Sequence, residues 1–228
     1  MQQHPRSLRD LFSSEHRRSL FEAFALLAVA YVVEHFANIY AFAYMSRPTS
    51  NHVGDLFLDN LPVIDLNFLI IEGAFFSIIL GVLYVLSKPR YVLFSLKALA
   101  LFIIIRALFV SLTHIGFYPV HVAPGVGFFA DLYSYLNFQL GFFFSGHTGL
   151  PFLIALIFWD NRRARLVLLS LSLVFGIAVL LAHTHYSIDV LAEPFMAYGI
   201  FKIAQHLFPR DYELTKATLR HKLWVQAS

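Results

Sequence analysis

Cysteine is absent from this chain of 228 residues, which excludes disulfide bonds and any metal site built from thiolates. Charged residues are also scarce: they make up 14% of the sequence, whereas soluble domains contain roughly a quarter. Hydrophobic residues instead reach 58%, Phe alone contributes 25 residues, and the mean hydropathy is +0.66. The composition therefore predicts an all-α, polytopic membrane protein rather than a soluble domain.

The formal net charge of +3 does not indicate nucleic-acid binding. The basic residues stand in short groups between apolar runs, which is typical of signals that orient membrane segments. The first 18 residues are polar, and the apolar run after them is too long for the core of a signal peptide. We therefore expect that run to be the first transmembrane helix.

Six stretches have the approximately 20 mostly apolar residues that a membrane-spanning helix needs. The fourth and fifth are short, and only the polar cluster 183–185 separates the fifth from the sixth. We predict a six-transmembrane-helix bundle over residues 19–208, with tails at 1–18 and 209–228. The predicted spans are Ser19–Met45, Ile64–Leu86, Tyr91–Thr113, Phe142–Trp159, Leu166–His183 and Tyr186–Phe208.

The connections between these spans alternate in charge. Both tails and two of the loops are basic, whereas the other three connections contain a single basic residue, Arg47. By the positive-inside rule both termini are cytoplasmic, and the loops with Asp55, Asp59, residues 114–141 and His185 lie on the exoplasmic or periplasmic side. The basic groups are Arg6, Arg9, Arg17 and Arg18; Lys88 and Arg90; Arg162, Arg163 and Arg165; and Arg210, Lys216, Arg220 and Lys222.

The densest polar cluster opens the predicted sixth span. His185 and Asp189 are four residues apart, so a helix would place them in contact on one face. A carboxylate beside an imidazole fixes its tautomer and raises its basicity, which suits a nucleophilic or general-base histidine. A polar first turn at the membrane interface explains the segment equally well. The cluster is His183-Thr184-His185-Tyr186-Ser187-Ile188-Asp189.

A second cluster, Ser145-Gly146-His147-Thr148, precedes Pro151 at the outer start of the fourth span. Because Pro favours a helix's first turn, we expect this helix to begin near residues 146–150, with its free N–H groups facing outward as an oxyanion or phosphate site. Taken alone, this cluster is explained better by a Ser or Thr helix cap with an incidental His than by a binding site. Together, the clusters place two histidines and a carboxylate at one face, which suits phosphoryl transfer.

Four ionisable residues lie deeper in the predicted spans, where a charge is costly and usually paired or functional. Arg106 and Glu72 lie at similar depth, and we expect an ion pair between them; in a second interpretation, Arg106 binds a substrate phosphate. Glu193 shares a helix face with the histidine–aspartate pair and could support it. Glu34 is somewhat deeper, and the sequence assigns it no role.

The outer loop 114–141 lacks Lys and Arg and is rich in aromatic residues. Such side chains favour the headgroup layer of a membrane, so the loop suits a cover over a lipid-accessible site. Simple interfacial anchoring explains them better than a cage for a quaternary ammonium group. The aromatic residues are Phe117, Tyr118, Phe128, Phe129, Tyr133 and Tyr135.

From about residue 55 to residue 198 the chain resembles the sphingomyelin synthase-like branch of the type 2 phosphatidic acid phosphatase superfamily of lipid phosphatases and phosphotransferases. Three departures stand out: Gln139-Leu140-Gly141 replaces Cys-Gly-Asp, Glu193-Pro194 replaces Ala-Tyr, and Ala178-Val179 replaces the phosphatase branch's Ser-Arg. In order, the four motifs resemble Asp55-Leu56-Phe57-Leu58-Asp59 with Glu72; Arg106; Ser145-Gly146-His147-Thr148; and His185-Tyr186-Ser187-Ile188-Asp189-Val190, where the family usually has Thr at 187.

The resemblance implies an exoplasmic site and a phosphohistidine mechanism with no metal or other cofactor. His185 would be the nucleophile, Asp189 its orienting carboxylate and His147 the acid/base. The headgroup phosphate of a phospholipid would move to ceramide or diacylglycerol, or to water in a phosphatase, and the sequence does not choose the acceptor. The substrate-binding residues would be Ser145, Gly146, Thr148, Arg106, Asp55, Glu72 and Tyr186.

Other classes of function stay open. A transporter or a haem- or metal-binding membrane protein would use His147, His183 and His185 as ligands. Against it, the polar groups lie at the outer edge of the membrane rather than at its midplane. A non-catalytic membrane scaffold would not need the histidines and the carboxylate at all. The sequence does not predict an oligomeric state.

Overall fold

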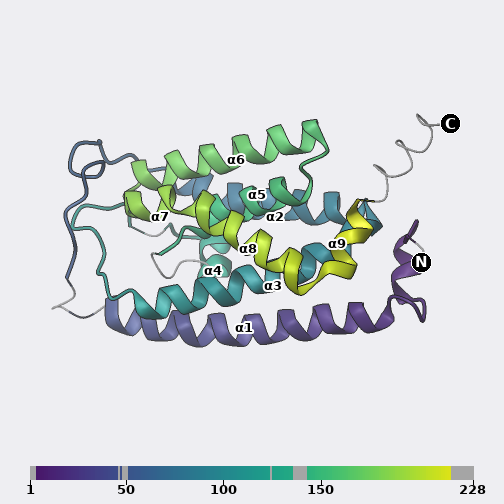
Figure 1. Ribbon diagram of the computed structural model, residues 1–228. Coiled ribbons are helices and arrows are strands. Elements are labelled where there is room, and N and C mark those ends of the chain that lie inside the picture. Colours follow the sequence, from purple (N-terminus) through teal and green to yellow (C-terminus); the bar gives the residue numbers. More distant parts are fainter. Residues whose placement is uncertain (1–3, 46, 48–50, 124, 136–142, 217–228) are drawn as a thin grey trace.

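The computed structural model describes residues 4–45, 47, 51–123, 125–135 and 143–216, and within these residues all regular structure is helical, which confirms the all-α class (Figure 1). The predicted tails are therefore described only in part, and the departure at Gln139–Gly141 lies outside the described residues. The helices are η1 (Leu8–Phe12), α1 (Arg17–Met45), α2 (Asn67–Leu86), α3 (Pro89–Leu112), α4 (Phe128–Tyr135), α5 (Gly146–Ile157), α6 (Arg162–Leu181), α7 (Ser187–Leu191), α8 (Glu193–Leu207) and α9 (Pro209–Thr215).

Four helices, α1, α2, α3 and α6, are long and apolar enough to cross a membrane. The predicted fourth and sixth spans correspond to shorter helices, α5 with 12 residues and α8 with 15. These lengths correspond to about 18 and 22 Å, less than the roughly 30 Å of a bilayer core. The chain is thus a helical membrane protein, while six crossings and cytoplasmic termini remain predictions.

The predicted sixth span is two helices rather than one. α7 ends at Leu191 and α8 begins at Glu193, with Pro194 in its first turn. Pro has no N–H group to donate to the carbonyl four residues earlier, so the helical ladder is interrupted there. The break separates Glu193 from the helix that carries Asp189.

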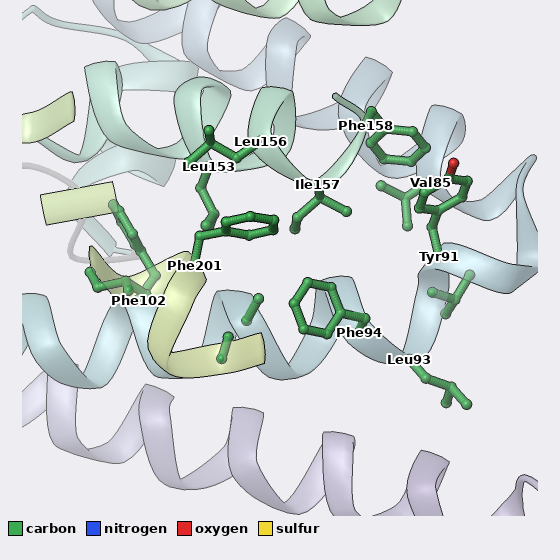
Figure 2. Packing of buried hydrophobic residues seen from close by; sticks show 14 of the residues in the cluster. Val85, Tyr91, Leu93, Phe94, Phe102, Leu153, Leu156, Ile157, Phe158 and Phe201 are labelled. Atoms are coloured by element: carbon green, nitrogen blue, oxygen red, sulfur yellow. The ribbon is translucent and has the colours of Figure 1, made fainter. Parts of the chain in front are cut away.

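The centre of the bundle is α3. In its most apolar stretch 56% of the residues are buried, compared with 22% in α1 and α2 and 28% in α6. α3 packs along α1 on one side and against α5, α8 and α9 on the other. Figure 2 shows Phe94 and Phe102 of α3 directed toward Leu153 and Ile157 of α5 and Phe201 of α8. The short helices α5 and α8 are therefore packed against the longer α3.

The outer surface of the long helices carries large exposed apolar side chains. Water would disfavour so large an apolar surface, whereas a bilayer covers it, so these side chains mark the lipid-facing surface. The exposed residues on α1 and α2 include Phe21, Phe24, Phe36, Phe42, Phe68, Phe76, Ile79 and Leu83.

The two ends of the bundle are built differently. η1 and α9 lie at one end, called here the α9 end, and α7 lies at the other, the α7 end (Figure 1). At the α9 end, the Ser19 hydroxyl donates to Asp211 Oδ1 at 2.7 Å. At the α7 end, loops bond to the end of α6: Ile64 N–H donates to the Leu181 carbonyl at 2.8 Å. This loop layer frames the candidate site.

Candidate active site

His185 and Asp189 are in contact, as the sequence predicts. His185 Nδ1 lies 3.3 Å from Asp189 Oδ2, and both residues are buried. The contact arises from a helix cap rather than a shared helical face, because α7 begins at Ser187 and Asp189 Oδ2 also accepts the N–H of Tyr186 at 3.0 Å. An ionised carboxylate only accepts, so this bond places the proton of a neutral His185 on Nδ1 and its lone pair on Nε2.

The first turn of α5 carries the second cluster. The helix begins at Gly146, within the expected range, and the buried Ser145 is its N-cap residue. The N–H of Ser145 donates to the carbonyl oxygen of Asp189 at 3.2 Å. Pro151 lies in the second turn of α5 rather than the predicted first turn. The main chain therefore joins two motifs that are about 40 residues apart in the sequence.

His147 lies beside His185. Their ring centres are 6.1 Å apart and their planes meet at 73°. Nε2 of His147 is hydrogen-bonded to the hydroxyl of Tyr133, which α4 supplies from the outer loop. The ring of Phe175 on α6 also packs against the imidazole, with ring centres 6.2 Å apart. Three separate elements thus fix the position of this histidine.

Arg106 approaches the same helix end from α3. Its Nε donates to the carbonyl oxygen of Phe144 at 3.0 Å, and a Cβ added at Gly146 would lie 3.4 Å from that nitrogen. Nη1 donates to Glu34 Oε1 on α1 at 2.6 Å. The expected Arg106–Glu72 pair is wrong, because α1 packs along α3 and places Glu34, rather than a residue of α2, opposite the guanidinium.

Arg106 and His147 line a cavity of about 110 Å³, whereas His185 and Asp189 are not among the described residues that line it. Its polar wall comes from α1, α3, α4 and the first turn of α5, and its apolar wall comes from α2, α5 and α6. A cation, a histidine and a helix N-terminus therefore face one small space, a combination that suits a phosphate group. The lining residues are Glu34, Ala74, Ser77, Ile78, Arg106, Tyr133, Gly146, His147, Leu150, Pro151 and Phe175.

Asp55 is bonded to the backbone rather than directed into this cavity. Its Oδ2 accepts the N–H of Ser187 at 2.7 Å, and its Oδ1 accepts those of Phe57 at 2.9 Å and Leu58 at 3.1 Å. Burial alone raises the pKa of Asp55, but the hydrogen bonds from Ser187, Leu58 and Phe57 outweigh it and hold the pKa below its ordinary value. In the structure this carboxylate caps the start of α7.

Tyr186, Glu72 and Thr148 also lie away from the cavity lining. The Tyr186 hydroxyl donates to the carbonyl oxygen of Gly116 at 2.8 Å, which anchors the outer loop. Glu72 lies half-buried on α2 and is not among the described residues that line the cavity. Thr148 is buried and its hydroxyl donates to Ser145 Oγ at 3.3 Å, so it stabilises the first turn of α5.

Glu193 and His183 have separate surroundings. Glu193 is completely buried, and within the described residues neither carboxylate oxygen has a hydrogen-bond partner. A Cβ added at Gly149 would collide with it, so the absent side chain at Gly149 makes room for this carboxyl group. His183 adopts a left-handed backbone with φ of 54°, and its Nδ1 is 2.9 Å from the carbonyl oxygen of Val120. Neither residue contributes to the cavity lining.

Sequence reasoning assigned no catalytic or binding role to Glu34 and named Tyr133 only as one of several aromatic residues. Glu34 had a detectable signal: an acid inside an apolar span needs a partner, and Arg106 was a suitable cation at nearby depth. Tyr133 had no such signal, because its contact with His147 depends on how the outer loop folds back over α5. Both residues line the cavity.

Within the ranges that the structure describes, no three His, Cys, Asp or Glu side chains are grouped closely enough to hold a metal ion. Residues 142–207 match the family described as PAP2 superfamily C-terminal. This segment is less than a third of the chain, and it contains both histidines of the site. The match supports the PAP2 superfamily, with a function of the lipid phosphatase or phosphotransferase type. No curated protein and no solved structure matches the chain significantly.

Proposed function

We propose that this integral membrane protein transfers the headgroup phosphate of a phospholipid through a phosphohistidine, in the manner of the sphingomyelin synthase-like branch. The observation that carries the proposal is the meeting of His147, the His185–Asp189 pair and Arg106 at the N-terminus of α5. The segment that matches the superfamily includes three of these four residues.

In the first step Nε2 of His185 attacks the phosphorus, and the bond from phosphorus to the oxygen of the leaving group breaks. Protonated His147 gives its proton to that oxygen. Asp189 stabilises the positive charge that develops on His185, because it holds the proton on Nδ1.

In the second step neutral His147 takes a proton from the acceptor hydroxyl, whose oxygen attacks the phosphorus. The phosphorus–nitrogen bond breaks, and His185 regains its lone pair. Each proton given in the first step is recovered in the second, so the enzyme returns to its initial state. The acceptor is a ceramide or diacylglycerol hydroxyl in our proposal, and water would make the same site a phosphatase.

Arg106 and the free N–H groups of α5 stabilise the charge on the phosphate oxygens. Glu34 orients the guanidinium from α1. Gly146 matters because it has no side chain, so a phosphate can approach both the helix end and the cation. The site faces the exoplasmic or periplasmic side in this proposal, since the charge pattern of the loops favours it.

The test uses purified protein in lipid nanodiscs with a chelator present. Labelled phosphatidylcholine, phosphatidylethanolamine or phosphatidic acid is supplied with and without ceramide or diacylglycerol. We expect headgroup release or transfer that His185→Ala abolishes, and an acid-labile, alkali-stable label on the wild-type protein. His206→Ala, which changes an exposed histidine at the last turn of α8, is the matched control.

Unchanged turnover by His185→Ala would exclude this residue as the nucleophile. Turnover that depends on added metal would favour the alternative in which the histidines are metal ligands. Product formation only with ceramide or diacylglycerol identifies a transferase, and formation without either identifies a phosphatase.

A further inference from the structure

A second, larger cavity lies between η1, α1, α2, α3, α5 and α6. Its volume is about 410 Å³, within the roughly 300–1,000 Å³ typical of small-molecule sites. None of its lining residues is charged, and only Ser77 and Ser95 carry a polar side chain. Because two hydroxyl groups offer water few hydrogen-bond partners, the cavity favours an apolar occupant.

This apolar cavity adjoins the polar cavity of the candidate active site. The two have four lining residues in common, Ser77, Ile78, Leu150 and Pro151. Along α2 the combined lining runs from Ala74, beside the polar cavity, to Leu86 near the α9 end. Leu86 is 12 residues beyond Ala74, which corresponds to about 18 Å of helix. The combined space is therefore polar at one end and apolar over a long remainder.

η1 closes the far end of the apolar cavity. Leu8, Leu11 and Phe12 all line it, and Leu11 is buried at 3% exposure. The short helix is held by its cap, in which Asp10 Oδ2 accepts the N–H groups of Arg6 at 2.7 Å and Ser7 at 2.9 Å. The polar side chain of Asp10 thus bonds to the backbone at the start of η1, and the apolar side chains of η1 form the end wall of the cavity.

We propose that the apolar cavity binds one hydrocarbon chain of the substrate lipid and that η1 limits the length of chain it accepts. This inference rests on the proposed function, because the phosphate in the polar cavity fixes where the chain enters. The chain then passes between α2 and α5 toward η1. The second chain of a two-chain lipid stays in the bilayer.

Gly81 provides a direct way to shorten the cavity. It lines the wall, and a Cβ added there would meet nothing within 4 Å, so the missing side chain opens onto empty space. Gly81 lies seven residues beyond Ala74 on α2, which corresponds to about 10 Å. A large residue at this position therefore blocks the distal part of the cavity and spares the part nearest the phosphate.

The experiment measures kcat/KM for water-soluble, single-chain substrates of increasing length, used below their micelle-forming concentration. In wild-type protein each added methylene should raise kcat/KM by up to about fourfold, because burial of one CH2 contributes about 0.8 kcal/mol. The rise should stop when the chain reaches η1. With Gly81→Phe it should stop several methylenes earlier, and with Leu11→Ala it should continue to longer chains.

Gly199→Phe is the matched control. Gly199 is also inside a helix with nothing within 4 Å of an added Cβ, but it does not line this cavity. Its length profile should follow the wild type. If Gly81→Phe does not fold, Gly81→Leu gives the same shift with a smaller side chain, and thermal unfolding monitors both.

An unchanged length profile in an active Gly81→Phe or Gly81→Leu protein would overturn the proposal. The same result would assign the cavity to a resident lipid that is not the substrate. The proposed function is tested separately, by measuring both lipid binding and turnover in the His185→Ala protein. The His185→Ala protein should retain the length preference in affinity for these lipids while it turns none of them over. If it keeps its turnover, the catalytic assignment fails whatever the length profile shows.

Discussion

Two buried cations lie nine residues apart on α3, and their surroundings differ. Each pairs with a carboxylate from α1: Lys97 Nζ lies 2.9 Å from Glu22 Oε2, and Arg106 Nη1 lies 2.6 Å from Glu34 Oε1. Lys97, at the α9 end, has a second carboxylate at 2.8 Å from Asp211 and lines none of the cavities described above. Arg106, toward the α7 end, lines the polar cavity.

The comparison shows how the same pairing of α1 with α3 serves two purposes. At the α9 end the Lys97 ammonium group bonds to two carboxylates, one on α1 and one on α9, and so fastens α9 to the bundle. At the α7 end a planar guanidinium bonds to the Glu34 carboxylate and to the Phe144 carbonyl oxygen beside an open space. A guanidinium suits phosphate recognition better than a compact ammonium group does.

The largest effect is expected for Arg106→Ala. Loss of one group that stabilises a developing charge typically lowers the rate by about 10²–10³-fold, and we expect that loss in kcat/KM for headgroup release. Lys97→Ala, assayed at equal amounts of folded protein, is the comparison and should stay within about threefold of wild type. Equal losses in the two variants would contradict the distinction between the two ends.

Lys97→Met should give the reverse result, with little change in activity and a large change in stability. It leaves Asp211, which is buried, without its cation, and breaking such a buried pair costs about 3 kcal/mol. Thermal unfolding in detergent measures the loss. Adding Asp211→Asn to Lys97→Met should recover part of it, because the uncompensated charge is then gone. No recovery would show that the ion pair is not the source of the stability.

An intermediate effect is expected for Tyr133→Phe, which removes the hydroxyl bonded to His147 and leaves the ring. One such hydrogen bond is worth about 1 kcal/mol, so we expect roughly a five- to tenfold fall in kcat and a displaced pH–rate profile. Tyr118→Phe is the matched control, since its hydroxyl bonds to Asp59 and it does not line the cavity. A rise in KM alone, with kcat and the pH profile unchanged, would indicate that Tyr133 only shapes the pocket.

The sequence predicted the parts of this molecule that depend on local pattern. Apolar length predicted the four long helices, and the spacing of His185 and Asp189 predicted their contact. α5 begins at Gly146, within the range expected for its start, although Pro151 lies in the second turn rather than the first. Each of these results depends on residues within one or two helical turns, where hydrophobic run length and capping decide the outcome.

The contacts between distant helices could not be predicted in this way. Arg106 was expected to meet Glu72 from the next helix in sequence, but the packing of α1 along α3 brings Glu34 to it instead. Lys97 received no role, because its partner Asp211 lies more than 100 residues away. Side-chain spacing within a helix does not encode which helices become neighbours, so both ion pairs required the three-dimensional structure.

The smallest effect is expected for Asp55, at the start of α7. Because its pKa is held below the ordinary value in the fold, its charge adds stability above the unfolded-state pKa of about 4 and loses that contribution as the pH falls through the folded-state value. Asp55→Asn should therefore cost about 1 kcal/mol at neutral pH, the scale of one hydrogen bond. Its melting temperature should also fall less steeply than that of wild type below about pH 5.

Thermal unfolding between pH 3 and 7 checks this expectation, and parallel curves for the two proteins would contradict it. The kinetic constants then separate the two roles of Asp55. A cap of α7 predicts a loss of activity in proportion to the loss of folded protein, because the carboxylate accepts the backbone N–H groups of Phe57, Leu58 and Ser187. Substrate binding, which the family resemblance implies, predicts a raised KM in fully folded protein. That result would place Asp55 with Arg106 rather than with Lys97, because its charge would then act on the ligand instead of on the fold.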